Sequence, residues 1–174
     1  MARQIALLRG INVGGSKKVA MAALREVFSD LGHSDVKTYV NSGNVVFSGP
    51  TTSAKKLEAA IEAAFGFDVA VVVRTRGEIA DVVAANPLRE VAADPSRYLV
   101  LFSGGGKIDP ARAADVETGA GEQLAIRGAE AYLWLPDGIH ASPLARAMNE
   151  KRLGVTLTGR NWRTVEKLLE LADG

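Results

Sequence analysis

Glycine, lysine and asparagine residues gather near the start of the sequence in a pattern suited to holding an anion. Residues 10–18 contain three glycines and two adjacent lysines, and Arg9 directly precedes them. Glycine lets backbone N–H groups approach a ligand closely, and a lysine or arginine supplies charge opposite to a phosphate or carboxylate. The first 25 residues carry five basic side chains and no acidic one. This segment therefore predicts a binding loop for an anionic ligand.

A second polar segment, residues 41–44, has the sequence Asn-Ser-Gly-Asn and predicts the turn of a hairpin. It follows a run in which apolar and polar residues alternate, and it precedes the apolar residues Val45, Val46 and Phe47. Its amide side chains are neutral donors and acceptors that complement the positive charge of the 10–18 loop. The two segments together form the candidate site.

The elements that must position these segments are indicated by hydrophobic periodicity in the first half. Strands are predicted at 4–8, 36–41, 45–47 and 69–73, and helices at 21–31 and 57–65. The order strand, helix, two strands, helix, strand is that of the ferredoxin-like unit. In this unit the first and second strands run parallel, so the 10–18 loop and the 41–44 turn lie at the same end.

The second half repeats this order of elements. Strands are predicted at 98–102, 123–126, 131–135 and 154–157, with helices at 110–116, 144–148 and 161–171. We therefore expect an α+β protein of two tandem ferredoxin-like (βαββαβ) halves, residues 1–92 and 93–174, with an extra C-terminal helix. Several strands are apolar on both faces, which favours the two halves packing as one body.

A further group of candidate contacts lies near the C-terminus. Arg160, Asn161 and Arg163 surround Trp162, and an aromatic side chain among arginines can stack on a nucleic-acid base. The alternative is structural, because Asn161 is a typical helix N-cap and Trp162 begins an apolar stripe that Val165 continues. The pattern favours this structural interpretation for Trp162.

Several enzyme chemistries have no support in the sequence. The 174 residues include no Cys and two His, which excludes a disulfide scaffold, and no metal site is predicted. Gly10 and Gly15 have the spacing of a nucleotide-binding P-loop, but Ser16-Lys17 stands where Lys-Ser or Lys-Thr is required. No catalytic residue and no cofactor is predicted, so enzymatic activity stays open.

Charge and hydropathy constrain the partners. Lys and Arg number 21 against 20 Asp and Glu, and the net charge of +1 argues against binding nucleic acid or membranes through charge alone. The longest apolar runs have the length of a strand, so no membrane-spanning segment is predicted, and no secretory signal is recognised. We expect a cytoplasmic protein, and its oligomeric state is not assigned.

Three segments resemble an uncharacterised bacterial family, the domain of unknown function 1697. They are Leu7 to Gly15, Thr38 to Phe47 and Thr158 to Val165, in the order that the family shows. The resemblance implies a duplicated α+β fold in a bacterial protein, and it implies no activity, substrate or catalytic residue. Two of the three segments contain the loops that topology places together.

Three functions are compatible with these residues. The first is a binding module for an anionic ligand, such as a nucleotide, a phosphate or a nucleic-acid segment. The second is an enzyme acting on a small phosphorylated or carboxylated substrate at the same loops, with a basic residue stabilising developing charge. The third is a structural or partner-binding protein without a ligand. The candidate contacts are polar residues of the two loops and of the C-terminal segment: Arg9, Asn12, Lys17, Asn41, Ser42, Asn44, Arg160, Asn161 and Arg163.

Overall fold

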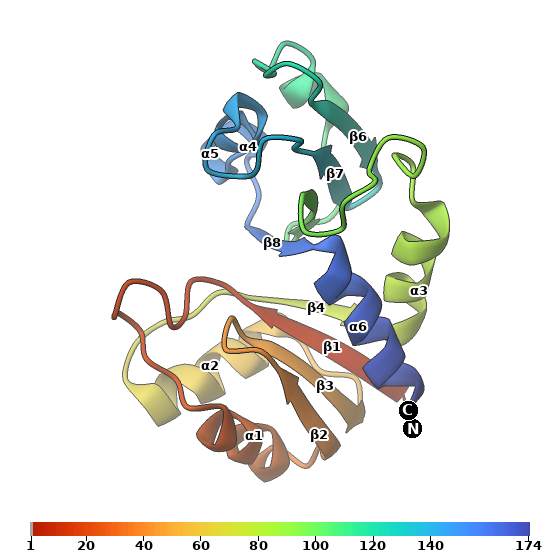
Figure 1. The fold of residues 1–174 in the computed structure, drawn as a ribbon. Helices are drawn as coiled ribbons and strands as arrows, with labels where there is room; N and C mark the ends of the chain where they lie inside the picture. The colour runs from red at the N-terminus through yellow and green to blue at the C-terminus, as the bar shows by residue number, and fades with distance from the viewer. Residues whose placement is uncertain (1) are drawn as a thin grey trace. The chain divides into compact units, whose positions relative to one another are not determined.

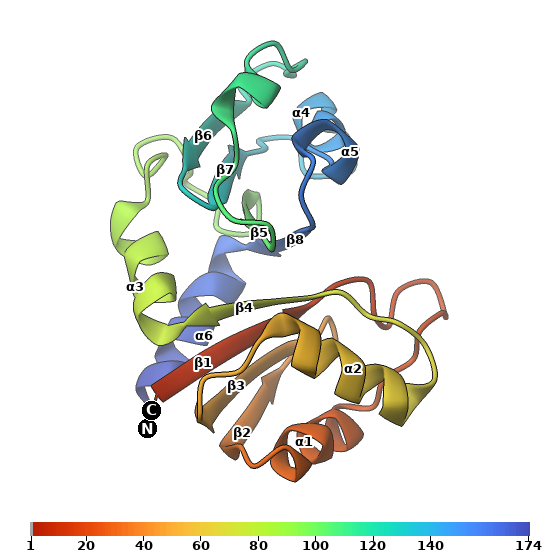
Figure 2. The ribbon, with the colours of Figure 1, turned by 180° about the vertical axis from the view of Figure 1, so that it is seen from behind.

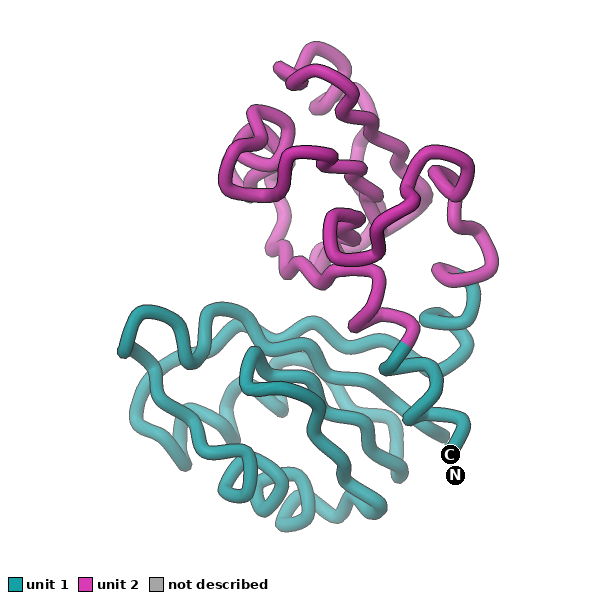
Figure 3. The backbone as a smooth tube through the Cα atoms, viewed as in Figure 1, with its two compact units in different colours: residues 1–81, 167–174 teal, residues 82–166 magenta. Residues whose placement is uncertain are grey.

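The computed structural model describes residues 2–174, which form an α+β protein with two four-stranded antiparallel sheets and six α-helices (Figure 1). The chain divides into two compact units (Figure 3). The first unit comprises the residues up to Asp81 together with Lys167–Gly174, and the second comprises Val82–Glu166. The expected division into halves at residue 92, and their packing as one body, stay predictions. Each unit is described by itself below.

The sheet of the first unit has the strand order β2-β3-β1-β4. Its elements are β1 (Ala2–Leu8), α1 (Met21–Asp30), β2 (Ser34–Tyr39), β3 (Asn44–Gly49), α2 (Ala54–Phe65) and β4 (Val71–Thr75). Both α1 and α2 lie on the same face of this sheet, as Figure 2 shows from behind. Between them and the sheet, Leu8, Leu24, Phe28, Phe47 and Ile61 are fully buried in one core cluster. The predicted helices and strands of this half are therefore present within a few residues of their expected bounds.

The two helices of the first unit begin in different ways. At α2, the Ser53 hydroxyl accepts a hydrogen bond from the Lys56 backbone N–H, and Gly66 ends the helix in the left-handed conformation. These are the usual cap residues, Ser at the N-cap and Gly just beyond the end. At α1, the N-cap residue is Ala20, which has no side-chain oxygen to accept such a bond. The N-terminus of α1 is therefore left without a side-chain cap.

The sheet of the second unit has the order β6-β7-β5-β8. Its elements are β5 (Tyr98–Ser103), the 3-10 turn η1 (Pro110–Ala113), β6 (Gln123–Arg127), β7 (Glu130–Trp134), α4 (Pro143–Ala147), α5 (Glu150–Leu153) and β8 (Leu157–Asn161). Buried residues of the strands and of α4 form a second core cluster that includes Leu101, Leu133 and Leu144. Two more helices, α3 (Arg76–Ala85) and α6 (Trp162–Asp173), follow directly on β4 and β8.

Two sequence predictions for the second unit are wrong in their bounds. The strand expected at 154–157 begins only at Leu157, because α5 occupies the preceding residues and ends at Gly154 in the left-handed conformation. Within this turn the Glu150 carboxylate accepts a hydrogen bond from the Leu157 backbone N–H at 2.8 Å. The helix expected at 110–116 is a single 3-10 turn that ends at Ala113.

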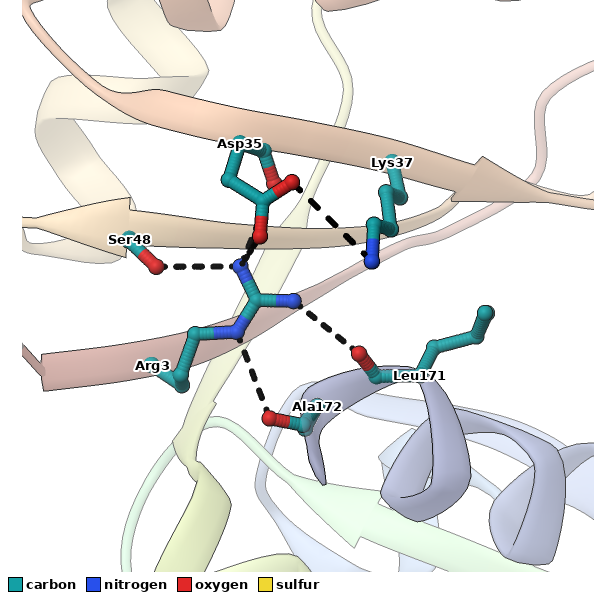
Figure 4. A network of polar contacts seen from close by, with 6 residues as sticks. All are labelled: Arg3, Asp35, Lys37, Ser48, Leu171 and Ala172. Carbon is teal, nitrogen blue, oxygen red and sulfur yellow. Dashed lines mark hydrogen bonds and ion pairs between the residues drawn. The ribbon is translucent and has the colours of Figure 1, made fainter. Parts of the chain in front are cut away.

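The end of α6 is bound to the first sheet through the Arg3 side chain (Figure 4). The guanidinium donates hydrogen bonds to the backbone oxygens of Leu171 and Ala172 at 3.0 and 3.3 Å, and to the Ser48 hydroxyl at 2.9 Å. It also forms an ion pair with Asp35 at 3.0 Å. A cation suits the negative end of a helix dipole. Arg3 is one of the five basic residues counted in the N-terminal segment, but its charge is used to attach the end of α6 to the sheet.

Among the residues that the structure describes, no helix combines the length and the apolar character needed to cross a membrane. The predicted cytoplasmic location stays a prediction.

Candidate functional site

The loop after β1 folds back on itself as a miniature hairpin. The Asn12 N–H donates to the Lys17 oxygen at 3.1 Å, and the Ser16 N–H donates to the Val13 oxygen at 3.2 Å. Its two central residues are glycines with φ of 61° and 79°. Two consecutive positive φ values are what a tight two-residue hairpin turn requires, and Gly-Gly adopts them without strain.

The side chain of Asn12 joins this loop to the hairpin turn between β2 and β3. Its Oδ1 accepts a hydrogen bond from the Val19 N–H at 2.8 Å, and its Nδ2 donates to the Val19 oxygen at 3.0 Å. The same Nδ2 donates to the Asn41 backbone oxygen at 2.8 Å. The two segments that topology predicts at the same end of the sheet are therefore in direct contact, and Asn12 holds them there.

A solvent-open hollow of about 540 Å³ lies where these segments meet the start of α1. It is lined by Asn12, Gly15, Lys18, Val19, Ala20 and Asn41. No acidic residue belongs to this lining, and Lys18 is exposed with no hydrogen bond or ion pair to any described residue. Because Ala20 is the N-cap of α1, the first-turn N–H groups of that helix lack a side-chain acceptor. The hollow therefore combines one lysine with the positive end of a helix dipole.

Only part of the predicted set lines the hollow. Asn12 and Asn41 do, whereas Lys17 is turned towards the segment before β4, where its ammonium donates to the Asp68 oxygen at 2.7 Å. The Asp68 carboxylate lies 3.8 Å from the same nitrogen and offsets its charge. Arg9 is exposed, is not one of the lining residues, and donates its backbone N–H to Ala70.

The other predicted residues of the 41–44 turn shape the backbone. Asn44 is completely buried, and its Nδ2 donates to the Tyr39 oxygen at 2.8 Å and to the Ser42 hydroxyl at 3.1 Å. Between them, Gly43 has a φ of 95°, and a Cβ there would lie 2.7 Å from the Leu8 Cβ. Only glycine fits this position, so the Asn-Ser-Gly-Asn sequence serves the architecture of the turn.

The C-terminal candidates belong to the second unit and are largely structural. Arg160 is 7% exposed and donates to the Thr158 hydroxyl and to the Gly159 oxygen, both at 2.8 Å. Burial lowers the pKa of its guanidinium to about 10, which keeps it charged at neutral pH. The Asn161 Oδ1 accepts a hydrogen bond from the Thr164 N–H at 2.9 Å, as the N-cap interpretation predicts.

The aromatic residue of that segment is part of a buried stack. Trp162 is buried, and its ring lies 4.8 Å from that of Tyr98, tilted by 22°. The structural interpretation of Trp162 is thereby confirmed. Arg163, the next residue, is exposed.

Backbone strain gathers around the hollow. The described residues include five non-glycine residues with positive φ. Two of them, Asn12 (55°) and Lys17 (47°), belong to the 10–18 loop, and a third, Val40 (49°), directly precedes the 41–44 turn. Such conformations cost free energy and concentrate at functional sites. For Val40 the cost is greatest, because a β-branched side chain tolerates this conformation poorly.

The candidate contacts predicted from the sequence do not include Lys18 or the N-terminus of α1. Lys18 has the same charge as Lys17, and only tertiary contacts distinguish them. The helix start carries a readable signal, since Ala20 occupies the N-cap position, where Ser, Thr, Asp or Asn is usual. Among the described residues no group of three or more His, Cys, Asp or Glu could hold a metal ion.

Comparison with known proteins places this fold in a family. Residues 1–132 match the family model described as a protein of unknown function, DUF1697. The chain belongs to the DUF1697 family. Its fold is also similar to the solved structure of SP0830, a conserved bacterial protein from Streptococcus pneumoniae, with a TM-score of 0.78 and 25% identity over 98% of each chain. No protein with a curated description matches this family member. The resemblance to the family that the sequence motifs indicate is confirmed.

Proposed function

We propose that the protein binds an anionic ligand, a phosphate or carboxylate group, in the hollow between the 10–18 loop and the 41–44 turn. The observation that carries the proposal is the lining of the hollow: an unpaired lysine, Lys18, beside a helix start that no side chain caps. Backbone N–H groups at a helix N-terminus and a cation together favour an anion. An acidic side chain, which would compete with such a ligand, is missing from the lining.

The loop itself supports the same ligand. Asn12 is committed to holding the two segments together, so it fixes the shape of the hollow and leaves the charge to Lys18. A shape fixed before binding lowers the cost of ordering the loop around a ligand. The roles of Asn12 and Asn44 in the fold equally favour the third function, a structural or partner-binding protein, which the experiment below separates.

We further propose that the two halves are tandem ferredoxin-like (βαββαβ) repeats, with the boundary near residue 92 between α3 and β5. Matching strand orders support this, and so do matching hydrogen bonds. The Leu8 N–H donates to the Gly43 oxygen at 2.8 Å, and the Ser103 N–H donates to the Ala129 oxygen at 2.9 Å. In both cases the last residue of the first strand is joined to the turn of the following hairpin.

Buried arginines support the repeat at the level of residues. Arg74 is the fourth residue of β4 and Arg160 the fourth of β8, and both are buried. Each guanidinium donates to the backbone oxygen of the residue before it, Val73 at 3.1 Å and Gly159 at 2.8 Å. A buried arginine with this local bond at the same strand position twice in one chain favours duplication over coincidence.

The binding proposal is tested by titrating the protein with inorganic phosphate and with a mixed oligonucleotide, followed by backbone amide NMR shifts. We expect phosphate to shift the amides of residues 15–23, and Lys18→Ala to weaken binding about tenfold, since a charge-assisted hydrogen bond contributes about 1.5 kcal/mol. Lys107→Ala is the matched control, because Lys107 is an exposed lysine at the end of the glycine-rich loop after β5.

Three outcomes decide between the functions. Equal losses in the two lysine variants would contradict a specific site, and an absence of any shift would favour the structural function. Binding of the oligonucleotide whose affinity falls steeply with salt would identify a nucleic-acid phosphate as the anion, because phosphate contacts release counterions.

A further inference from the structure

Strand β6 forms one edge of the second sheet, and its outer side has the features of a surface that pairs with another strand (Figure 1). Its residues match those of β7 one to one, from Gln123 opposite Trp134 to Arg127 opposite Glu130, with no shift in register. The strand contains no proline, and Arg127 is its one charged residue. A regular, uninterrupted edge strand is a template for pairing with another chain.

The backbone of β6 has hydrogen-bonding groups that point away from its own sheet. A two-residue turn joins β6 to β7, so Arg127 and Glu130 exchange both backbone hydrogen bonds. Hydrogen-bonded pairs alternate along an antiparallel ladder, so the N–H and C=O groups of Leu124 and Ile126 face outward. The Ile126 oxygen accepts a hydrogen bond from the Arg127 guanidinium at 3.1 Å. The other outward groups have no hydrogen bond to a described residue.

Strand β2, which has the same position in the first sheet, has a different edge. Its register with β3 shifts between Ser34 and Lys37, and Asp35 within this shift has a φ of 48°. The Asp35 carboxylate also forms ion pairs with Arg3 and Lys37. Bulges and charged side chains keep an edge strand from pairing with another chain. The edge of β2 is therefore protected, whereas that of β6 is open along its regular register.

A second copy of β6 is complementary to this edge. All the outward backbone groups of both copies form hydrogen bonds when Leu124 of each copy lies opposite Ile126 of the other. Two-fold symmetry then places Ala125 opposite its own counterpart and Gln123 opposite Arg127. Leu124 and Ile126 pack against the core of the second unit and are partly exposed. Placing them opposite each other would remove apolar surface from water.

Charge complementarity supports the same register. A solvent-open hollow of about 370 Å³ lies beside the start of β6, and its lining includes Gln123 and Glu90. Glu90 is exposed and has no hydrogen bond or ion pair to a described residue. Because Arg127 of the second copy lies opposite Gln123, its guanidinium meets this carboxylate. Arg89 also lines the hollow, but its guanidinium donates to backbone oxygens at the end of α3.

We propose that the protein forms a homodimer in which the β6 strands of two copies pair antiparallel and join their second sheets into one. Each contact occurs twice, because a two-fold interface is self-complementary. A stable interface involves about 20 to 30 residues a side, so pairing through one short strand should give a weak dimer, with a dissociation constant of about 0.1 mM. No residue of the proposed anion site takes part, so either proposal can fail without the other.

Sedimentation velocity of the full chain measures the association. We expect the sedimentation coefficient to rise from the monomer value between about 0.01 and 1 mM, on either side of the expected dissociation constant. Arg127→Glu should weaken association at least about tenfold, because it places like charges together, and adding Glu90→Arg should restore it. Lys151→Glu makes the same change of charge at an exposed lysine of the second unit and should have no effect.

A single cysteine tests the register, because the chain has none of its own. Ala125 and its counterpart form a pair without mutual hydrogen bonds, with Cα atoms about 4.5 Å apart, a distance that a disulfide spans. Ala125→Cys should therefore give disulfide-linked dimers under mild oxidation. Gln123→Cys is the matched control, because its counterpart lies about 13 Å away, and it should stay monomeric.

Three results would overturn the inference. The first is a wild type that stays monomeric over the whole concentration range. The second is an association that Arg127→Glu leaves unchanged and Ala125→Cys does not trap, which would place the contact elsewhere. The third is a monomeric protein whose β6 amides shift in NMR spectra when a synthetic peptide of alternating threonine and valine is added, which would show that the edge takes another extended chain instead of a second copy.

Discussion

The loops that follow β1 and β5 begin in the same way, but different groups attach them to the neighbouring hairpin. Both leave the sheet through a backbone hydrogen bond, from Arg9 to Ala70 in the first unit and from Gly104 to Thr156 in the second. Beyond that point, the first loop is attached to the neighbouring hairpin by the Asn12 side chain. The second is attached by the Ile108 backbone N–H, which donates to the Gly128 oxygen at 2.9 Å.

The two attachments differ in how closely they pack each loop against its own unit. Ile108 buries its side chain in the second core, and a Cβ on Gly105 would lie 2.9 Å from the Val155 side chain. That loop is therefore packed against its own unit. In the first loop a Cβ on Gly14 or Gly15 would meet no atom within 4 Å. Because the polar side chain of Asn12 attaches the first loop, its glycines are not packed against the core, and an open hollow lies beside the loop.

The largest effect is expected where a glycine is packed between the loop and the first strand. Gly43→Ala should destabilise the protein by about 3 to 4 kcal/mol, because its Cβ would overlap Leu8 and its φ of 95° is unfavourable for alanine. Gly128→Ala, in the matching turn of the second unit, has open space and a φ of 58°, and should cost about 1 kcal/mol. Urea denaturation measures both; equal costs would contradict the packing argument.

Ile108→Ala tests the apolar closure of the second loop. Removing a buried isoleucine should cost about 3 kcal/mol of stability, since transfer and cavity terms add. Phosphate binding at the first unit should be unaffected at temperatures where the variant is folded. Amide NMR titration checks the binding, and a loss of binding would show that the two closures are not independent.

Asn12→Ala tests the polar closure of the first loop. The variant loses the hydrogen bonds to Val19 and Asn41, and alanine is less suited than asparagine to a φ of 55°, so we expect about 2 kcal/mol of destabilisation. Phosphate binding should be lost even where the protein is folded, because the hollow depends on this attachment. Asn12→Asp keeps only the acceptor for the Val19 N–H and should bind phosphate poorly; normal binding by either variant would contradict the role of Asn12.

The smallest effect concerns the two histidines, which lie in different units. His33 is buried against Phe47, whereas His140 is exposed. Burial, and then the charge of Lys56, lower the pKa of His33. The unfolded state therefore binds more protons, so stability is complete above about pH 6.5 and falls as the pH drops through the lowered folded pKa. Denaturation curves at several pH values should show this loss in the wild type and in His140→Gln, but not in His33→Gln.

Much of the fold could be predicted from the sequence because its signals are local. Alternation and helical spacing predict the order of strands and helices along the chain in both halves. Asn161 marks the start of the last helix, where its side chain forms the N-cap hydrogen bond. The errors occur where short turns compete with regular elements, as at α5, where a capped four-residue helix displaces the start of β8. Such turns are decided by side-chain bonds such as that of Glu150 to Leu157.

The candidate site shows most clearly what the sequence determines and what only the folded chain decides. The sequence by itself determined that a glycine-rich basic loop and a polar turn share one end of a sheet, because strand direction follows from element order. The tertiary structure alone decided which of these basic residues are already paired within the fold. Lys17 is bound by Asp68, 51 positions later, and Arg3 by the end of α6, while the adjacent Lys18 faces the hollow. Partners so distant in sequence leave no local pattern, so charge can be read from the sequence, but whether it is already neutralised depends on the folded chain.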